Sequence, residues 1–232
     1  MPGHGETVGF SLEDLKADRV IDKLKLFFDA LGLTRPTCLI GTSMGGSIVA
    51  MFAAKYPSYV QMICLLAPVP PGGYCETDAI RQIRSGMYDI ILPRTHEQFY
   101  TTADTFAMKK IHCRHLLASQ YLKTKLSAID QHKKILQSAF ENDYPNLEKS
   151  YAPLKDLTCP ALIIWGDKDQ LCAVEGAHYF VDLIPNTELV MLKNCGHLIL
   201  FDKPKETAKS ILKFCNDYHP SHQTNRLVQV TF

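Results

Sequence analysis

Ser43, in the segment GTSMG at residues 41–45, has the surroundings of a catalytic nucleophile. The pattern G-x-S-x-G is typical of a sharp turn between a strand and a helix, where the serine adopts a strained backbone conformation. Small neighbours are needed to leave that serine room, and we expect Gly41 and Gly45 to provide it. We expect Gly46 to let the following helix pack closely. Ser43 is therefore the candidate nucleophile.

A serine nucleophile needs a base that takes its proton and an acid that orients the base. The acid and the histidine usually follow a serine of this kind in that order. Here Asp167 and Asp169 occur in WGDKD, and His197 follows in NCGH. We expect Asp169 to accept the Nδ1 proton of His197, so that Nε2 can take the proton of Ser43. Asp167 is expected to be a turn or capping residue.

The reaction also needs two backbone N–H donors for the oxyanion that forms on the substrate. We expect the first from Met44, at the start of a helix whose dipole favours negative charge. The second donor should come from a loop after an earlier strand. Because the sequence has no expected strand before residue 37, we expect the second donor to be missing from this chain.

These residues must be positioned by the ends of strands. Four short apolar segments are expected to be strands: 37–43, 60–68, 161–166 and 187–194. Helical patterns are expected at 11–31, 44–56, 174–184 and 203–218. A capping box of Ser11 and Asp14 should begin the first helix, and Gly32 should end it. Apolar strands that alternate with helices predict an α/β fold with a parallel sheet covered on both faces.

A long stretch between the second and third expected strands has helical patterns but no convincing strand. We interpret it as a helical cap over the carboxyl ends of the strands, where ligands bind in α/β proteins. The expected division is a core in residues 1–68 and 156–218, a cap or lid in residues 69–155 and a loose tail in residues 219–232. Candidates for lining a lipid site in the cap are Phe99, Phe106, Met108, Leu116 and Leu117.

The composition excludes several classes of protein. The 232 residues contain 25 Lys and Arg against 24 Asp and Glu, which does not suggest nucleic-acid binding. No segment approaches the roughly 20 apolar residues of a membrane span. The eight cysteines lack the paired spacing of zinc sites, so we interpret them as reduced thiols of an intracellular protein. Cys195, two residues before His197, is expected to make the protein sensitive to bulky thiol reagents.

With Ser43, Asp169 and His197 in this order, the sequence resembles the α/β-hydrolase superfamily. The segments MPGHG, LIGTSMGGSIV, IIWGDKDQ and NCGH look like those of the membrane-anchored monoacylglycerol lipases of the α/β-hydrolase-domain group. The resemblance implies a partial α/β-hydrolase fold and a serine hydrolase that cleaves carboxylic esters of lipids, most of all monoacylglycerols. It also implies that Ser43, Asp169 and His197 form the catalytic triad, and that no metal or cofactor takes part.

In that group a membrane helix and four strands precede the segment with which this chain begins. The resemblance therefore implies that the chain is the C-terminal part of a longer protein, whose membrane contact lies in a missing N-terminal segment. Two alternatives stay open. One is a truncated isoform with impaired catalysis that binds lipid or a partner, and the other is a carbon–carbon bond hydrolase of the same superfamily.

Overall fold

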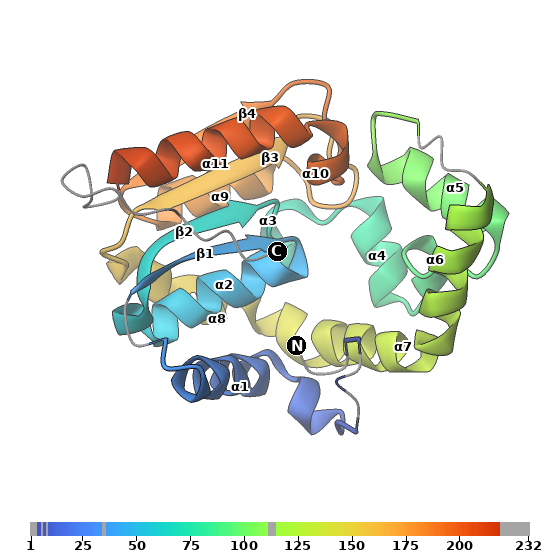
Figure 1. Cartoon of the computed structure of the whole chain (residues 1–232), viewed down its shortest axis with the longest axis horizontal. Helices are drawn as coiled ribbons and strands as arrows, with labels where there is room; N and C mark the ends of the chain where they lie inside the picture. The colour runs from blue at the N-terminus through green and yellow to red at the C-terminus, as the bar shows by residue number, and fades with distance from the viewer. Residues whose placement is uncertain (1–3, 6, 8, 34–35, 111–114, 219–232) are drawn as a thin grey trace.

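The computed structural model of the chain describes residues 4–5, 7, 9–33, 36–110 and 115–218 (Figure 1). The expected loose tail therefore lies outside the described residues. The strands are β1 (Thr37–Thr42), β2 (Val60–Leu66), β3 (Ala161–Gly166) and β4 (Thr187–Leu192). They pair in the order β1-β2-β3-β4, and all three pairings are parallel. The prediction of an α/β fold with a parallel sheet is confirmed.

Helices and turns connect these strands. The helices are α1 (Ala17–Ala30), α2 (Met44–Lys55), α3 (Gly72–Cys75), α4 (Asp78–Arg84), α5 (His96–Phe106), α6 (His115–Ser127), α7 (Ile129–Ser138), α8 (Leu147–Tyr151), α9 (Glu175–Leu183), α10 (Ile199–Asp202) and α11 (Pro204–Tyr218). The 3-10 turns are η1 (Glu13–Leu15), η2 (Pro57–Tyr59), η3 (Tyr88–Ile90), η5 (Tyr144–Asn146) and η6 (Ala152–Asp156), while η4 (Ala139–Asp143) is a π-helical turn.

The strands differ in burial according to their place in the sheet. All six residues of β3 are buried, which fits a strand with a neighbour on each side and a helix on each face. Strand β1 pairs only with β2 among the described strands, and Ile40 in it is 46% exposed.

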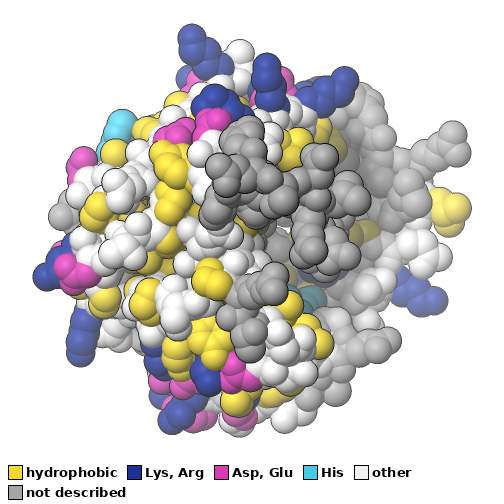
Figure 2. Space-filling model, turned by 60° about the vertical axis from the view of Figure 1, so that its left-hand side comes forward, with side chains coloured by type: hydrophobic (Ala, Val, Ile, Leu, Met, Phe, Trp, Pro, Cys, Tyr) yellow, Lys and Arg dark blue, Asp and Glu magenta, His cyan; other side chains and the backbone are white. Residues whose placement is uncertain are grey.

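The face in Figure 2 shows Lys and Arg side chains mixed with carboxylates and apolar groups, in keeping with the balanced charge of the chain.

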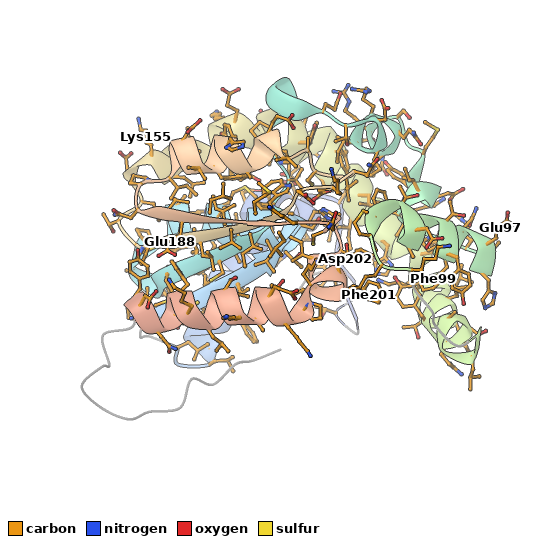
Figure 3. The ribbon with its side chains drawn as sticks, turned by 90° about the horizontal axis from the view of Figure 1, so that it is seen from above. Glu97, Phe99, Lys155, Glu188, Phe201 and Asp202 are labelled. Carbon is orange, nitrogen blue, oxygen red and sulfur yellow. The ribbon has the colours of Figure 1, made fainter. Side chains whose placement is uncertain are left out.

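Helices cover both faces of the sheet. Figure 3 shows α11 on one side of the strands and α9 on the other. Helix α2 packs on β1 and β2 and also contacts α8 and η6, and η6 in turn contacts α9. The helical elements α2, α8, η6 and α9 therefore form one continuous layer on the sheet. The core between the layers is formed by buried apolar side chains such as Phe52, Ile63 and Trp165. This packing fixes the strands whose carboxyl ends carry the site.

The first helix begins later than predicted. Asp14 and Ser11 form the expected capping box, in which Ser11 N donates to Asp14 Oδ2 at 3.1 Å and Asp14 N donates to Ser11 Oγ at 3.3 Å. However, this box caps the short turn η1. Lys16, which follows η1, has an extended ψ of 144°, so α1 begins only after Lys16. Gly32 ends α1 as predicted, because its φ of 65° is the left-handed conformation of a C-terminal cap.

The described residues between β2 and β3 form helices and turns only. Helices α4 to α7 extend beyond the carboxyl ends of the strands (Figure 1). By contrast, Leu147, Tyr151 and Leu154 belong to the same buried cluster as the strands. The division into core and cap at residue 155 therefore stays a prediction. None of the helices in the described ranges is both long and apolar enough to cross a bilayer.

Candidate functional site

Ser43 lies in the turn between β1 and α2. Its φ of 52° and ψ of −126° are sparsely populated for a residue with a side chain, so the turn is strained there. A Cβ atom on Gly41 would lie 2.3 Å from the carbonyl oxygen of Gly45, which confirms that this position needs glycine. A Cβ atom on Gly45 itself would meet nothing within 4 Å, so the expectation for Gly45 is wrong. Gly46 makes the second close approach, since a Cβ there would lie 3.1 Å from the oxygen of Gly41.

The structure brings Ser43, His197 and Asp169 together at the carboxyl ends of β1, β4 and β3. Nε2 of His197 lies 3.0 Å from Oγ of Ser43, and Nδ1 lies 2.8 Å from Oδ2 of Asp169. The side chains of His197 and Asp169 are buried, with exposed fractions of 6% and 0%. The other carboxylate oxygen of Asp169 accepts backbone N–H groups of Leu171 and Cys172, both at 2.8 Å.

This arrangement of atoms defines what each group can do. Two backbone donors hold one oxygen of Asp169, which leaves the other free to accept the Nδ1 proton of His197. With that proton on Nδ1, the lone pair of Nε2 points at the hydroxyl of Ser43. The three residues can therefore remove a proton from the serine and return it, which is the chemistry of acyl transfer.

Asp167 has a different place. Its Oδ1 accepts the backbone N–H of Cys195 at 3.3 Å, and its own N–H donates to the carbonyl of Leu192. Asp167 thus ties the turn after β3 to the loop that leads to His197. The geometry favours Asp169 over Asp167 as the partner of the imidazole.

The position of Cys195 argues against the expected sensitivity to thiol reagents. The residue is fully buried, and this burial raises the pKa of its thiol to about 12. The thiolate is the form that reacts with thiol reagents. We therefore expect Cys195 to be unreactive in the folded protein.

Met44 is the first residue of α2, so its N–H is one of the helix donors that have no partner within the helix. This position suits the first oxyanion donor. The second donor, expected to be missing from this chain, stays a prediction. The described residues contain no group of three or more His, Cys, Asp or Glu side chains that could hold a metal ion.

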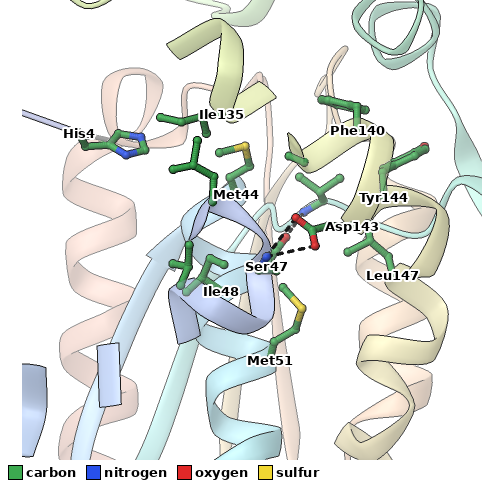
Figure 4. A pocket seen from close by; sticks show the side chains of 15 residues that line it. His4, Met44, Ser47, Ile48, Met51, Ile135, Phe140, Asp143, Tyr144 and Leu147 are labelled. Atoms are coloured by element: carbon green, nitrogen blue, oxygen red, sulfur yellow. Dashed lines mark hydrogen bonds between the residues drawn. The ribbon is translucent and has the colours of Figure 1, made fainter. Parts of the chain in front are cut away.

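An apolar pocket of about 80 Å³ lies beside Met44 (Figure 4). Its wall combines α1, α2, α7 and η4. The lining residues are His4, Leu15, Ala17, Val20, Met44, Ser47, Ile48, Met51, Val69, Ile135, Ala139, Phe140, Asp143, Tyr144 and Leu147. Met44 in the wall follows Ser43 directly in the sequence, whereas Ser43 itself is not among the lining residues.

None of the predicted lining residues with a described side chain belongs to this pocket. Phe106 is buried, and its backbone carbonyl lies next to Gly196 in the loop before His197. The ring of Phe99 contacts that of Tyr121, with 5.3 Å between the ring centroids. Met108 and Leu116 are 50% and 70% exposed. The side chain of Leu117 lies outside the described ones. The sequence patterns favoured residues in and near α5 and α6, whereas residues of α1, α2, α7 and η4 line the pocket.

Asp143 is the one carboxylate among the described residues of the pocket wall, and nothing in the sequence pointed to it. Both of its oxygens accept the N–H of Ala17, at 3.1 and 3.2 Å, at the start of α1. Burial raises the pKa of Asp143 to about 6. The carboxylate therefore connects the pocket to the first helix and titrates in a mildly acidic range.

Comparisons with known proteins identify the family of this chain and some of its relatives. Residues 1–204 match the family described as alpha/beta hydrolase fold. The monoacylglycerol lipase ABHD6 of Homo sapiens is 27% identical over 98% of this chain and 69% of its own length.

Solved structures are similar in fold. Lip1 of Acinetobacter baumannii AYE matches with a TM-score of 0.83 and 22% identity, over 94% of this chain and 73% of that protein. The 2-hydroxy-6-oxo-6-phenylhexa-2,4-dienoate hydrolase of Rhodococcus sp. strain RHA1 matches with a TM-score of 0.70 and 16% identity, over 91% and 74%. At these identities the two structures show a common fold and not a common substrate.

Proposed function

The chain belongs to the α/β-hydrolase fold family, and from this premise we propose that it is a serine hydrolase of carboxylic esters. In the proposal Ser43 is the nucleophile, His197 the general base and Asp169 the acid that orients it. The observation that carries the proposal is the continuous hydrogen-bond chain from Ser43 Oγ through His197 to Asp169, at 3.0 and 2.8 Å.

The reaction proceeds in two steps. First, Oγ of Ser43 attacks the ester carbonyl while Nε2 of His197 takes the hydroxyl proton, and the N–H of Met44 stabilises the oxyanion. The tetrahedral intermediate then releases the alcohol, which receives that proton from His197, and leaves an acyl-serine. In the second step His197 takes a proton from water while the water oxygen attacks the acyl group, and a second tetrahedral intermediate forms. This intermediate releases the carboxylic acid, and His197 returns the proton to Oγ of Ser43, so that the free enzyme is restored.

The proposed substrates are lipid esters with one acyl chain, above all monoacylglycerols. Two observations support this choice. The human relative is a monoacylglycerol lipase, and the pocket beside Met44 is lined mainly by apolar side chains. In the proposal the acyl chain lies in this pocket while its ester carbonyl lies at Ser43. A lipid substrate also implies contact with a membrane or another lipid surface.

The carbon–carbon bond hydrolase and the impaired, lipid-binding protein remain alternative candidates. The Rhodococcus structure shares the fold at 16% identity and adds no argument for its substrate. The described residues of the pocket wall include no Lys or Arg, and this apolar wall also suits an acyl chain better than an acidic ring-cleavage product.

A fluorophosphonate probe tests the proposal, because it labels only a serine that its neighbours activate. We expect labelling of the parent protein and none of Ser43→Ala. Ser210→Ala is the matched control, because Ser210 is a partly exposed serine on α11 whose hydroxyl donates to the carbonyl of Glu206 in the same helix. Hydrolysis of a monoacylglycerol is then compared with hydrolysis of a ring-cleavage product. A folded parent protein that takes no label would refute the proposal and favour the impaired protein.

A further inference from the structure

The geometry points to Asp202 as a positioning residue for His197. Its carboxylate connects the loop before the histidine to the residues that follow α5. This connection keeps the imidazole of His197 in position. The inference rests on the proposed function, because it concerns how the proposed base is positioned. Asp202 does not contact Ser43, His197 or Asp169 in any hydrogen bond of the described residues.

Asp202 is the last residue of α10, and its exposed fraction is 0%. One oxygen, Oδ2, accepts the N–H of Gly196 at 2.7 Å and the N–H of Met108 at 2.8 Å. The other, Oδ1, accepts the N–H groups of Lys109 at 2.9 Å and Met108 at 3.0 Å. Figure 3 shows Asp202 between the sheet and the insertion that carries α5. A single carboxylate thus joins two segments far apart in the sequence.

Backbone contacts support the same junction on the other side of His197. The N–H of Leu198 donates to the carbonyl of Phe106 at 3.0 Å. A Cβ atom on Gly196 would lie 2.4 Å from that carbonyl oxygen, so the loop needs glycine to come this close. The residues before and after the histidine are therefore both held by the end of α5.

The charge of Asp202 makes this contact sensitive to substitution. No Lys or Arg forms an ion pair with it in the described part of the chain, so backbone N–H groups alone compensate the buried carboxylate. Hydrogen bonds from N–H groups to an ionised oxygen are among the strong ones. Since Nε2 of His197 must stay near 3 Å from Ser43, a displacement of about 1 Å would cost on the order of 100-fold in rate.

Asp202→Asn is the sharpest test, since the amide has nearly the size and shape of the carboxylate. An amide offers one oxygen and one NH₂ group, and the NH₂ group must face either Gly196 or Lys109, whose N–H groups are also donors. We expect kcat for a short p-nitrophenyl ester to fall about 10- to 100-fold while KM changes less than about 3-fold. The rate of fluorophosphonate labelling should fall in parallel.

Asp22→Asn is the matched control, because Asp22 on α1 accepts the hydroxyl of Tyr56 at 2.7 Å and lies outside the site. We expect this variant to keep the kcat of the parent. All assays are run well below the melting temperature of each variant and divided by the folded fraction. An Asp202→Asn protein with unchanged kcat, or with a loss fully explained by its folded fraction, would overturn the inference.

A second measurement needs no activity. The proton between Nδ1 of His197 and Asp169 is expected to give a far-downfield NMR signal in the parent and in Asp22→Asn, and the signal should weaken or disappear in Asp202→Asn. An unchanged signal in Asp202→Asn would overturn the positioning role even if the parent hydrolysed no ester. Absence of labelling in the parent would instead contradict the proposed function.

Discussion

Oγ of Ser43 and Nε2 of His197 lie 3.0 Å apart although 154 positions separate the two residues in the sequence. The parallel sheet explains this proximity. Ser43 follows β1 and His197 follows β4, and parallel strands place their carboxyl ends at one edge. The distance between the two atoms therefore depends on the register of the four strands. We expect substitutions of Ser43 or His197 to lower the rate of hydrolysis more than they lower the stability of the fold.

The first prediction concerns the acid. Asp169→Asn should lower kcat about 10⁴-fold, since the amide favours the tautomer of His197 that cannot take the serine proton. Asp167→Asn should lower kcat less than about 10-fold, because Asp167 contacts Cys195 and not the imidazole. Steady-state hydrolysis of a monoacylglycerol, with circular dichroism to confirm folding, measures both. A larger loss in Asp167→Asn than in Asp169→Asn would show that the wrong aspartate was chosen.

The second prediction uses two glycines of the same turn. Gly41→Ala should destabilise the protein by about 3 kcal/mol or more, because the new methyl group would lie 2.3 Å from a backbone oxygen that cannot move without opening the turn. Gly45→Ala should change stability by less than about 1 kcal/mol, since that position faces open space and alanine favours helices. Urea unfolding of both variants provides the comparison, and equal stabilities would contradict the close packing.

The sequence could predict much of this site because its signals are local. Strand β3 has the predicted bounds, and the residues at the ends of β1, β3 and β4 meet as expected. The pocket wall could not be predicted, since Met51 and Phe140 come from elements that meet only through tertiary packing. The role of Asp202 could not be predicted either, because an acidic residue in the segment FDKP looks like an ordinary polar residue before a surface helix.

The third prediction concerns the length of the acyl chain. Met51→Trp should lower kcat/KM for a long-chain monoacylglycerol at least about 10-fold more than for a short-chain ester, since the indole would fill the part of the pocket farther along α2. Met87→Trp is the control, because Met87 is 54% exposed and outside the pocket. Chain-length profiles of the three proteins provide the measurement. An equal loss for both esters in Met51→Trp would mean that the acyl chain binds elsewhere.

The fourth prediction follows from the raised pKa of Asp143. Burial raises this pKa from an ordinary value of 3.8 to about 6, so the folded protein keeps a proton that the unfolded chain has lost between pH 4 and 6. The stabilising contribution is present below pH 4 and is lost as pH rises through 6. Its size is at most about 3 kcal/mol, and less because part of the carboxyl group reaches solvent.

Asp143→Asn should remove this pH dependence. The amide oxygen can still accept the N–H of Ala17, which the carboxylate accepts at 3.1 Å, and it does not ionise. The melting temperature of the variant relative to the parent should therefore rise from pH 4 to pH 7. Asn142→Ala is the control, since it removes a neighbouring amide and should keep the pH dependence of the parent. A difference between Asp143→Asn and the parent that stays constant from pH 4 to pH 7 would show that this carboxyl group does not titrate in that range.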